Sequence, residues 1–174
     1  MKALRALSLT QPWASLIVIG AKRIETRSWW TTYRGMIAIH AAKKFPADCR
    51  DLCWDEPFRS TLEGAALVDY HSYDDLEADS FERFTALPLG MIVAVAQLRQ
   101  VTETTDLNWM FAHDAFGVQP DIEREFGDYS PGRFAWVLGD VRPLLVPIPC
   151  KGSLGLWTVP AMLYEAIAPQ LAMS

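Results

Sequence analysis

Charged side chains of both signs gather in one short segment of the chain. Lys22, Glu25 and Arg27 lie in the stretch GAKRIETRSWW, residues 20–30, directly after the apolar run WASLIVI. A carboxylate placed among cations can orient a polar ligand or accept a proton, and a partly buried lysine can act as a base or nucleophile. The alternative is a solvated cluster of ion pairs, which stabilises a protein only slightly.

Aromatic rings flank this charged segment. The chain holds seven tryptophans, and Trp29 and Trp30 close the stretch. Stacking of a nucleic-acid base on such a ring contributes about 1–3 kcal/mol. Tryptophans more often fill a hydrophobic core, and a core position is what we expect for Trp54, Trp109 and Trp157.

A second polar segment, FGDYSPGRFAW, follows at residues 126–136. Tyr129, Ser130 and Arg133 supply a ring, a hydroxyl and a guanidinium, a combination that suits a base edge or a phosphate. The alternative is a structural turn with a surface arginine, since Pro131 and Gly132 are typical turn residues.

Other reactive residues carry weaker signals. His40 lies in a predicted strand, where a hydrogen-bonded core histidine is the better interpretation. Cys49 and Cys53 are spaced for one helix face, but no histidine or third cysteine is near them in sequence to complete a zinc site. The phosphate-binding GxxxxGK(S/T) loop and the dinucleotide-binding GxGxxG motif are both absent. We therefore predict no metal and no cofactor.

The charge is distributed unevenly along the chain. Residues 1–50 hold nine Lys or Arg against two Asp or Glu, a net charge of +7, and the remainder holds seven cations against 19 anions, a net charge of −12. A local basic patch attracts phosphate even when the whole molecule is acidic, so a polyanion is a candidate partner. The alternative is a basic lobe that docks on an acidic one.

Compartment and membrane signals are simple. The three cysteines form no CxxC pair, and residues 1–10 lack the basic-then-apolar pattern of a signal peptide. No apolar run approaches the roughly 20 residues of a membrane span. We expect a cytoplasmic protein that does not insert into membranes.

The hydrophobic pattern predicts alternating strands and helices. We expect strands over residues 3–9, 24–29, 35–41, 90–101 and 134–149, and helices over 10–20, 46–54, 57–67, 108–114 and 160–173. Thr10 is the expected cap of the first helix and Gly20 its end. Pro143 and Pro147 are typical of an edge strand, and the glycine-rich segment 151–157 is predicted as a connection.

These elements form one domain over residues 1–174. The fold class is α+β, a small, mainly antiparallel β-barrel with flanking helices. The acidic stretch at about residues 55–87 is interpreted as an insertion, helical in part, that lies over the core.

The combination of motifs resembles a known family. GAKRIETRSW matches the GxKxxExR signature of the ASCH (activating signal cointegrator 1 homology) domain family, and LSLTQPWASLI, YRGMIAIHAAK, LPLGMIVAVAQL, GRFAWVL and KGSLGLW agree with its context. The resemblance spans nearly the whole chain except residues 55–84. It implies a fold of the PUA-like superfamily, with a cleft for RNA or a modified nucleoside beside the signature.

Carried onto this sequence, the resemblance implies a set of site residues. The signature positions are Gly20, Lys22, Glu25 and Arg27. We expect Lys22, Arg27 and Lys43 to meet phosphate or base edges and Glu25 to accept a hydrogen bond from a base amino group. Trp30 or Tyr129 would stack on a base, and Arg133 would add a cation from the second loop.

The resemblance also leaves an enzymatic alternative open. Small bacterial relatives hydrolyse N4-acetylcytidine with a Lys of this motif, a Thr three residues later and a Glu further on. Here Lys22 is present, Glu25 stands at the Thr position, and Glu103 follows the long strand. Other members are associated with RNA cleavage, for which Lys22, Tyr129 and Ser130 are candidate participants.

Three hypotheses follow for function. The first is a module that binds RNA or a modified nucleoside. The second is a metal-free hydrolase, either a nucleoside amidohydrolase or a ribonuclease. In it Lys22 acts as base or nucleophile, Glu25 carries a proton, and the Gly132–Arg133 backbone donates hydrogen bonds to an oxyanion. The third is a regulator that binds a protein partner through the acidic half of the chain.

Overall fold

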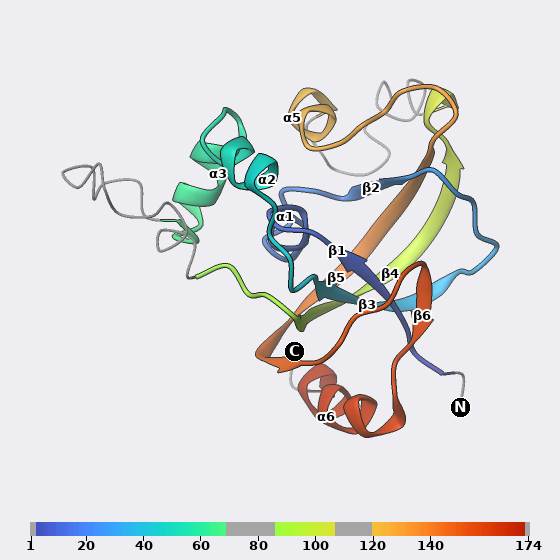
Figure 1. Ribbon diagram of the computed structural model, residues 1–174. Coiled ribbons are helices and arrows are strands. Elements are labelled where there is room, and N and C mark those ends of the chain that lie inside the picture. The colour runs from blue at the N-terminus through green and yellow to red at the C-terminus, as the bar shows by residue number, and fades with distance from the viewer. Residues whose placement is uncertain (1–2, 69–85, 107–119, 173–174) are drawn as a thin grey trace.

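A six-stranded mixed sheet forms the centre of the computed structural model, which describes residues 3–68, 86–106 and 120–172. The strand order is β2-β5-β4-β3-β1-β6; β1 and β3 run parallel, and the other described neighbours pair antiparallel. The sheet curls into a half-barrel with helices around it (Figure 1). The strands are β1 Arg5–Leu9, β2 Ile24–Arg27, β3 Gly35–Ala41, β4 Met91–Glu103, β5 Phe134–Pro149 and β6 Leu156–Thr158. The α+β, PUA-like fold class is thereby confirmed.

Alternation along the central strands gives each face of the sheet its own core. On β3, Ile37 and Ile39 pack in a cluster with Ile17 of helix α1 (Trp13–Val18). Ala38 lies between them in sequence and packs in a cluster with Ile167 of helix α6 (Ala161–Ala172). Because side chains on a strand point alternately to its two faces, α1 and α6 cover opposite faces of the same sheet.

The turn after α1 places the signature segment. Gly20 adopts φ +79°, a left-handed conformation that favours glycine, and its N–H donates to the carbonyl of Ile17 at 3.0 Å. The N–H of Lys22 donates to the carbonyl of Leu16 at 3.0 Å. These two bonds close the helix, so the chain enters β2 within a few residues.

The start of α1 differs from the prediction. Pro12 precedes the helix and no side chain caps it, so Thr10 is not the cap. Gln11 supplies the polar partners instead: its Oε1 accepts from the N–H of Ser15 at 3.1 Å and its Nε2 donates to the carbonyl of Pro88 at 2.8 Å. The buried amide of Gln11 thus ties α1 to the segment that enters β4.

Two short helices follow β3, as predicted, with narrower bounds. They are α2 (Ala47–Leu52) and α3 (Phe58–Gly64). Leu16 of α1 packs with Phe58, Leu62 and Phe126 in a third cluster. This cluster joins α1 to α2, α3 and the end of helix α5 (Pro120–Glu125), which the sequence analysis did not predict. The predicted helix over 108–114 and the acidic run after residue 68 fall outside the described residues.

Strand β5 agrees with the edge-strand prediction in its second half and differs from it in its first. Its first residues, Phe134–Val137, pair with β2 on one side and with β4 on the other, so this part lies inside the sheet. Pro143 and Pro147 come after the pairing with β2 ends, where β4 is the described neighbour. A missing N–H costs little on that free side, which explains why prolines are tolerated there. A short 3-10 turn, Thr104–Asp106, follows β4, and β6 occupies part of the predicted connection.

Nothing in the described part of the chain is both long and apolar enough to form a membrane-spanning helix.

Candidate functional site

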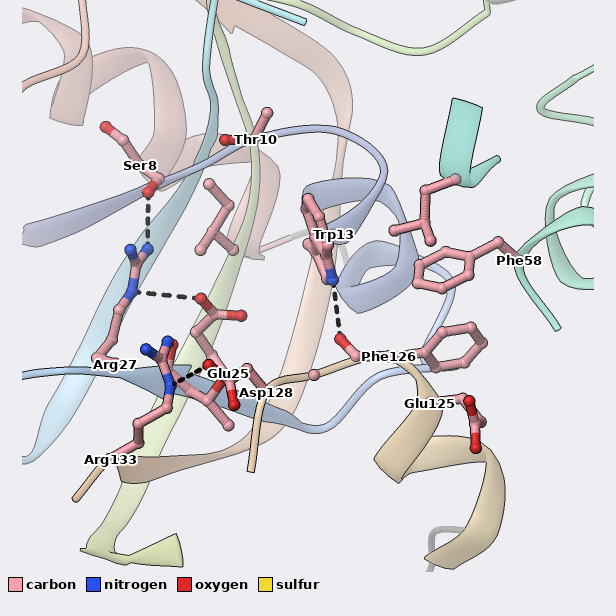
Figure 2. Close-up of a pocket in the computed structure, with 14 residues that line it drawn as sticks. Ser8, Thr10, Trp13, Glu25, Arg27, Phe58, Glu125, Phe126, Asp128 and Arg133 are labelled. Carbon is pink, nitrogen blue, oxygen red and sulfur yellow. Dashed lines mark hydrogen bonds and ion pairs between the residues drawn. The ribbon is translucent and has the colours of Figure 1, made fainter. Parts of the chain in front are cut away.

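A cleft of about 420 Å³ opens where the end of β1, the start of α1 and β2 meet the segment after α5 (Figure 2). Helices α2 and α3 each contribute one side chain to it. The lining residues are Ser8, Leu9, Thr10, Trp13, Glu25, Thr26, Arg27, Leu52, Phe58, Glu125, Phe126, Gly127, Asp128 and Arg133. Two of the three charged residues of the GxKxxExR signature, Glu25 and Arg27, therefore reach this cleft.

One wall of the cleft is made of ion pairs. Arg27 Nε lies 3.2 Å from Glu25 Oε1, and Arg27 Nη2 donates to the carbonyl of Ser8 at 2.8 Å. Arg133 Nε lies 3.3 Å from Asp128 Oδ2, and Arg133 Nη2 donates to the carbonyl of Thr26 at 3.3 Å. The backbone bonds hold both guanidinium groups in place, which limits the conformational entropy that a ligand must remove.

The opposite wall is apolar and aromatic. Trp13 is half-buried and donates from Nε1 to the carbonyl of Phe126 at 2.8 Å. The rings of Trp13 and Phe58 meet edge to face at 6.3 Å, and those of Phe58 and Phe126 at 5.0 Å. Figure 2 shows Trp13 and Phe58 on the far side of the cleft from Arg27 and Arg133. Since its neighbours fix the indole plane, Trp13 offers a rigid surface to a flat ligand.

Beneath the cleft lies a buried ion pair. Lys22 and Glu123 are fully buried, with Nζ of Lys22 at 3.6 Å from Oε1 of Glu123. Glu123 also accepts from the N–H of Arg23 at 2.8 Å, the N–H of Ile24 at 3.1 Å and the hydroxyl of Tyr129 at 3.0 Å. One carboxylate from α5 therefore anchors the whole start of β2.

Burial shapes the protonation of this group. Desolvation raises the pKa of Glu123, and the Lys22 charge, the two backbone N–H groups and the Tyr129 hydroxyl act against that rise by stabilising the ionised form. Desolvation also raises the pKa of Tyr129, and the Glu123 charge adds to the effect. Tyr129 is consequently a neutral hydrogen-bond donor and not a base.

Gly127 separates the cleft from the buried amine of Lys22. It lines the cleft, and a Cβ built on it would lie 3.1 Å from Lys22 Nζ and 2.9 Å from Cε2 of Tyr129. The absence of a side chain therefore lets the backbone pass directly over the buried amine. Lys22 does not line the cleft itself.

The remaining predicted binding residues lie away from the cleft. Gly20 ends α1, and Lys43 is exposed after β3. Trp30 is 48% exposed, lies 5.6 Å edge to face from Phe134 and has the guanidinium of Arg34 at 5.6 Å above its ring. The structure thus brings Glu25, Arg27 and Arg133 together at the cleft, and it places Trp30 on another surface.

The additional catalytic candidates are also dispersed. Glu103 is exposed at the end of β4, opposite Phe134 of β5. Ser130 is exposed, its N–H donates to Asp128 Oδ1 at 3.0 Å and its carbonyl accepts from Thr104 at 2.9 Å. These bonds make Ser130 part of the turn that carries Arg133.

His40 is a hydrogen-bonded core histidine. Its Nδ1 lies 3.1 Å from Ser8 Oγ and its Nε2 3.2 Å from the carbonyl of Cys150. Burial lowers the pKa of His40, and Gly152 packs so closely that a Cβ there would lie 2.4 Å from the ring. The ring is buried and packs against segment 150–157.

The basic residues of the first 50 positions do not share one surface. Arg27 faces the cleft and Lys22 is buried. Arg5 and Arg34 line a second hollow, with Ala3, Thr32 and Tyr33, at the opposite end of β1. The charge asymmetry of the sequence therefore does not translate into a single basic face.

In the part of the chain that the structure describes, no group of three or more His, Cys, Asp or Glu is placed to hold a metal ion. Burial, together with the Asp48 carboxylate, raises the pKa of Cys49 to about 11, and burial raises that of Cys53 to about 12, which disfavours the reactive thiolate form of both.

The sequence did not identify several residues of the site. They are Trp13, Phe58 and Asp128, which line the cleft, and Glu123, which lies buried beneath it. Pro120 at the start of α5 and Gly127 just after its end are ordinary helix signals, so α5 itself was predictable. The pairing of Glu123 with Lys22 was not, because about 100 residues separate the two in sequence.

Comparisons with known proteins agree with this fold and this signature. Residues 7–147 match the sequence model of the ASCH domain. Activating signal cointegrator 1 of Mus musculus and that of Homo sapiens are each 28% identical to the chain over 159 residues, which cover 91% of this chain and 23% of theirs. The chain is thus similar to less than a quarter of those longer proteins.

Solved structures extend the likeness to three dimensions. The crystal structure of ASCH from Zymomonas mobilis superimposes with a TM-score of 0.52 at 14% identity and covers 97% of this chain and 96% of its own. At that identity the match concerns the fold alone. Together with the match over residues 7–147, it shows that this chain belongs to the ASCH domain family.

Proposed function

We propose that this protein is an RNA-binding ASCH domain that takes one base of single-stranded RNA, or a modified nucleoside, into the cleft. One observation carries the proposal. In a cleft of about 420 Å³, the rigid indole of Trp13 lies opposite a wall of ion pairs formed by Glu25 with Arg27 and by Asp128 with Arg133. A nucleobase has an apolar face and a polar edge, and so it matches both walls at once.

The two arginines give the cleft its affinity for RNA. Each guanidinium is already bonded to a backbone carbonyl and lies beside a carboxylate. Each remains able to donate to a base oxygen or to the phosphate of the bound nucleotide. Two arginines are enough to contact one nucleotide and its immediate neighbours. They do not form an extended binding surface for many phosphates.

Salt dependence tests this function. We expect a fluorescently labelled single-stranded RNA of eight nucleotides to bind with a slope of log K against log salt no steeper than about −1.4, because two arginines give about −0.7 each. Fluorescence anisotropy from low to physiological salt measures the slope, and a free nucleoside should show almost none. Absence of RNA binding at low salt would contradict the proposal, and so would a much steeper slope, which would indicate an extended phosphate surface elsewhere.

The hydrolase alternative has weaker support. Its nucleophile or base, Lys22, is fully buried and lies beneath Gly127, paired with Glu123. Attack on a ligand would require the Gly127 backbone to move. Incubation with N4-acetylcytidine and with RNA, alongside Lys22→Ala, examines this alternative, since turnover lost in a folded variant would establish an enzyme.

The protein-partner alternative rests on the acidic half of the chain. Helix α3 of that half packs Phe58 and Leu62 into the core, and Phe58 also lines the cleft. The described part of the acidic segment therefore supports the cleft.

A further inference from the structure

We propose that the cleft selects guanine among the RNA bases, by binding its Watson–Crick edge to Glu25. This inference rests on the proposed function and adds the identity of the base to it. It is carried by the one carboxylate at the centre of the cleft and by the hydrogen bonds that the protein leaves unmade around it.

Glu25 has acceptor capacity to spare. Arg27 Nε lies beside its Oε1 at 3.2 Å, and among the described residues no donor is bonded to Oε2. The side chain is 10% exposed, and it lines the cleft. A carboxylate oxygen that the protein leaves without a donor is open to a ligand that supplies N–H groups.

The charge of the lining points to the same kind of ligand. Three carboxylates, of Glu25, Glu125 and Asp128, line the cleft together with two guanidinium groups, of Arg27 and Arg133. With one more anion than cation among its lining residues, the cleft attracts phosphate less strongly than a basic groove would. It favours a neutral group that donates hydrogen bonds.

Guanine meets this requirement better than the other three bases. Its Watson–Crick edge presents N1–H and N2–H side by side, a pair of parallel donors that fits the two oxygens of one carboxylate. Its O6, next to N1–H, would then point toward Arg27, whose Nη1 makes no hydrogen bond to the described protein. The ring would stack on Trp13 on the other side of the cleft (Figure 2).

The other bases leave a mismatch at the carboxylate. Adenine and cytosine offer one amino N–H on this edge, but the adjacent ring nitrogen turns a lone pair toward the second oxygen. Uracil offers one N–H between two carbonyl oxygens, which would face the carboxylate on both sides. Repulsion of this kind is an effective source of specificity in a nearly buried site.

Oligonucleotides that differ in one base test the inference. The labelled RNAs 5′-AAXAA-3′, with X = G, inosine, A, C or U, are compared by fluorescence anisotropy. We expect the G oligonucleotide to bind tightest, by at least about 10-fold over A, C and U, which is the discrimination of a good bidentate pair. Inosine lacks the 2-amino group and should lose most of that advantage.

A variant links the preference to the carboxylate. Glu25→Gln replaces one acceptor oxygen with a donor NH₂, so it should bring the G and A oligonucleotides to within about 3-fold of each other. Arg99→Gln, at an arginine with a side chain 55% exposed on the far part of the sheet, is the matched control and should keep the preference. Circular dichroism verifies that both variants are folded.

The outcomes separate this inference from the proposed function. RNA binding without preference for G, or with a preference for C, or a G preference that survives in folded Glu25→Gln, would overturn the guanine assignment and leave RNA binding intact. If Glu25→Gln does not fold, the inosine comparison in the unaltered protein decides. Failure of every oligonucleotide to bind would overturn the proposed function together with the guanine assignment.

Discussion

Replacing Glu123 with alanine is expected to destabilise the protein by about 3–5 kcal/mol, the range found when one partner of a buried ion pair is removed. The change would leave the ammonium of Lys22 buried without its counter-charge. It would also remove the acceptor of the N–H groups of Arg23 and Ile24 and one acceptor of the Tyr129 hydroxyl. Because one carboxylate serves three donors and one ammonium, the loss should approach the upper end of the range.

Urea denaturation measures this loss, and two further variants make it interpretable. Lys22→Met removes only the charge partner of Glu123 and leaves its three hydrogen bonds, so it should cost clearly less than Glu123→Ala. Glu165→Ala, at an exposed glutamate of α6, should change stability by no more than about 0.5 kcal/mol. Equal stabilities of Glu123→Ala and Glu165→Ala would show that Glu123 does not anchor β2.

Removing both cleft arginines is expected to weaken RNA binding by at least about 100-fold. Hydrogen bonds to a charged group contribute about 1.5–3 kcal/mol each, and Arg27→Gln with Arg133→Gln removes two such donors. Fluorescence anisotropy with the same eight-nucleotide RNA measures the loss.

Arg34→Gln is the informative control for this double variant. Arg34 lines the second hollow beside Trp30, at the other end of β1. If RNA lies in the cleft, Arg34→Gln binds as the unaltered protein does. Loss of binding in Arg34→Gln, with binding retained in the double variant, would place the RNA at the second hollow and refute the cleft.

Local pattern predicted much of the fold, because most elements carry their own signal. The alternation of Ile37, Ala38 and Ile39 predicts a strand with two buried faces, and the structure assigns these residues to cores on opposite faces of the sheet. The spacing of Glu25 and Arg27 places both on one side of β2, and both line the cleft. Short-range geometry, with a period of two, is enough for such inferences.

The features of the site that the sequence did not predict depend on contacts between residues far apart in the chain. The sequence shows Lys22 among other cations and gives no indication of Glu123, which closes over it from a helix about 100 residues later. Trp13 carries the period of a core residue and does pack against Phe58, yet the sheet and the segment after α5 leave part of it open. Such exposure depends on how distant elements meet, and single-sequence periodicity does not encode it.

The tryptophans themselves provide the most direct test of where RNA binds. In ¹⁵N-labelled protein each of the seven indole N–H groups gives its own resonance, and Trp13→Phe and Trp30→Phe assign two of them. Trp13 donates its indole N–H to Phe126 inside the cleft, whereas Trp30 is 48% exposed beside the second hollow. On titration with single-stranded RNA, we expect the Trp13 resonance to shift and the Trp30 resonance to stay in place. A shift confined to Trp30, with Trp13 unmoved at saturating RNA, would contradict this expectation.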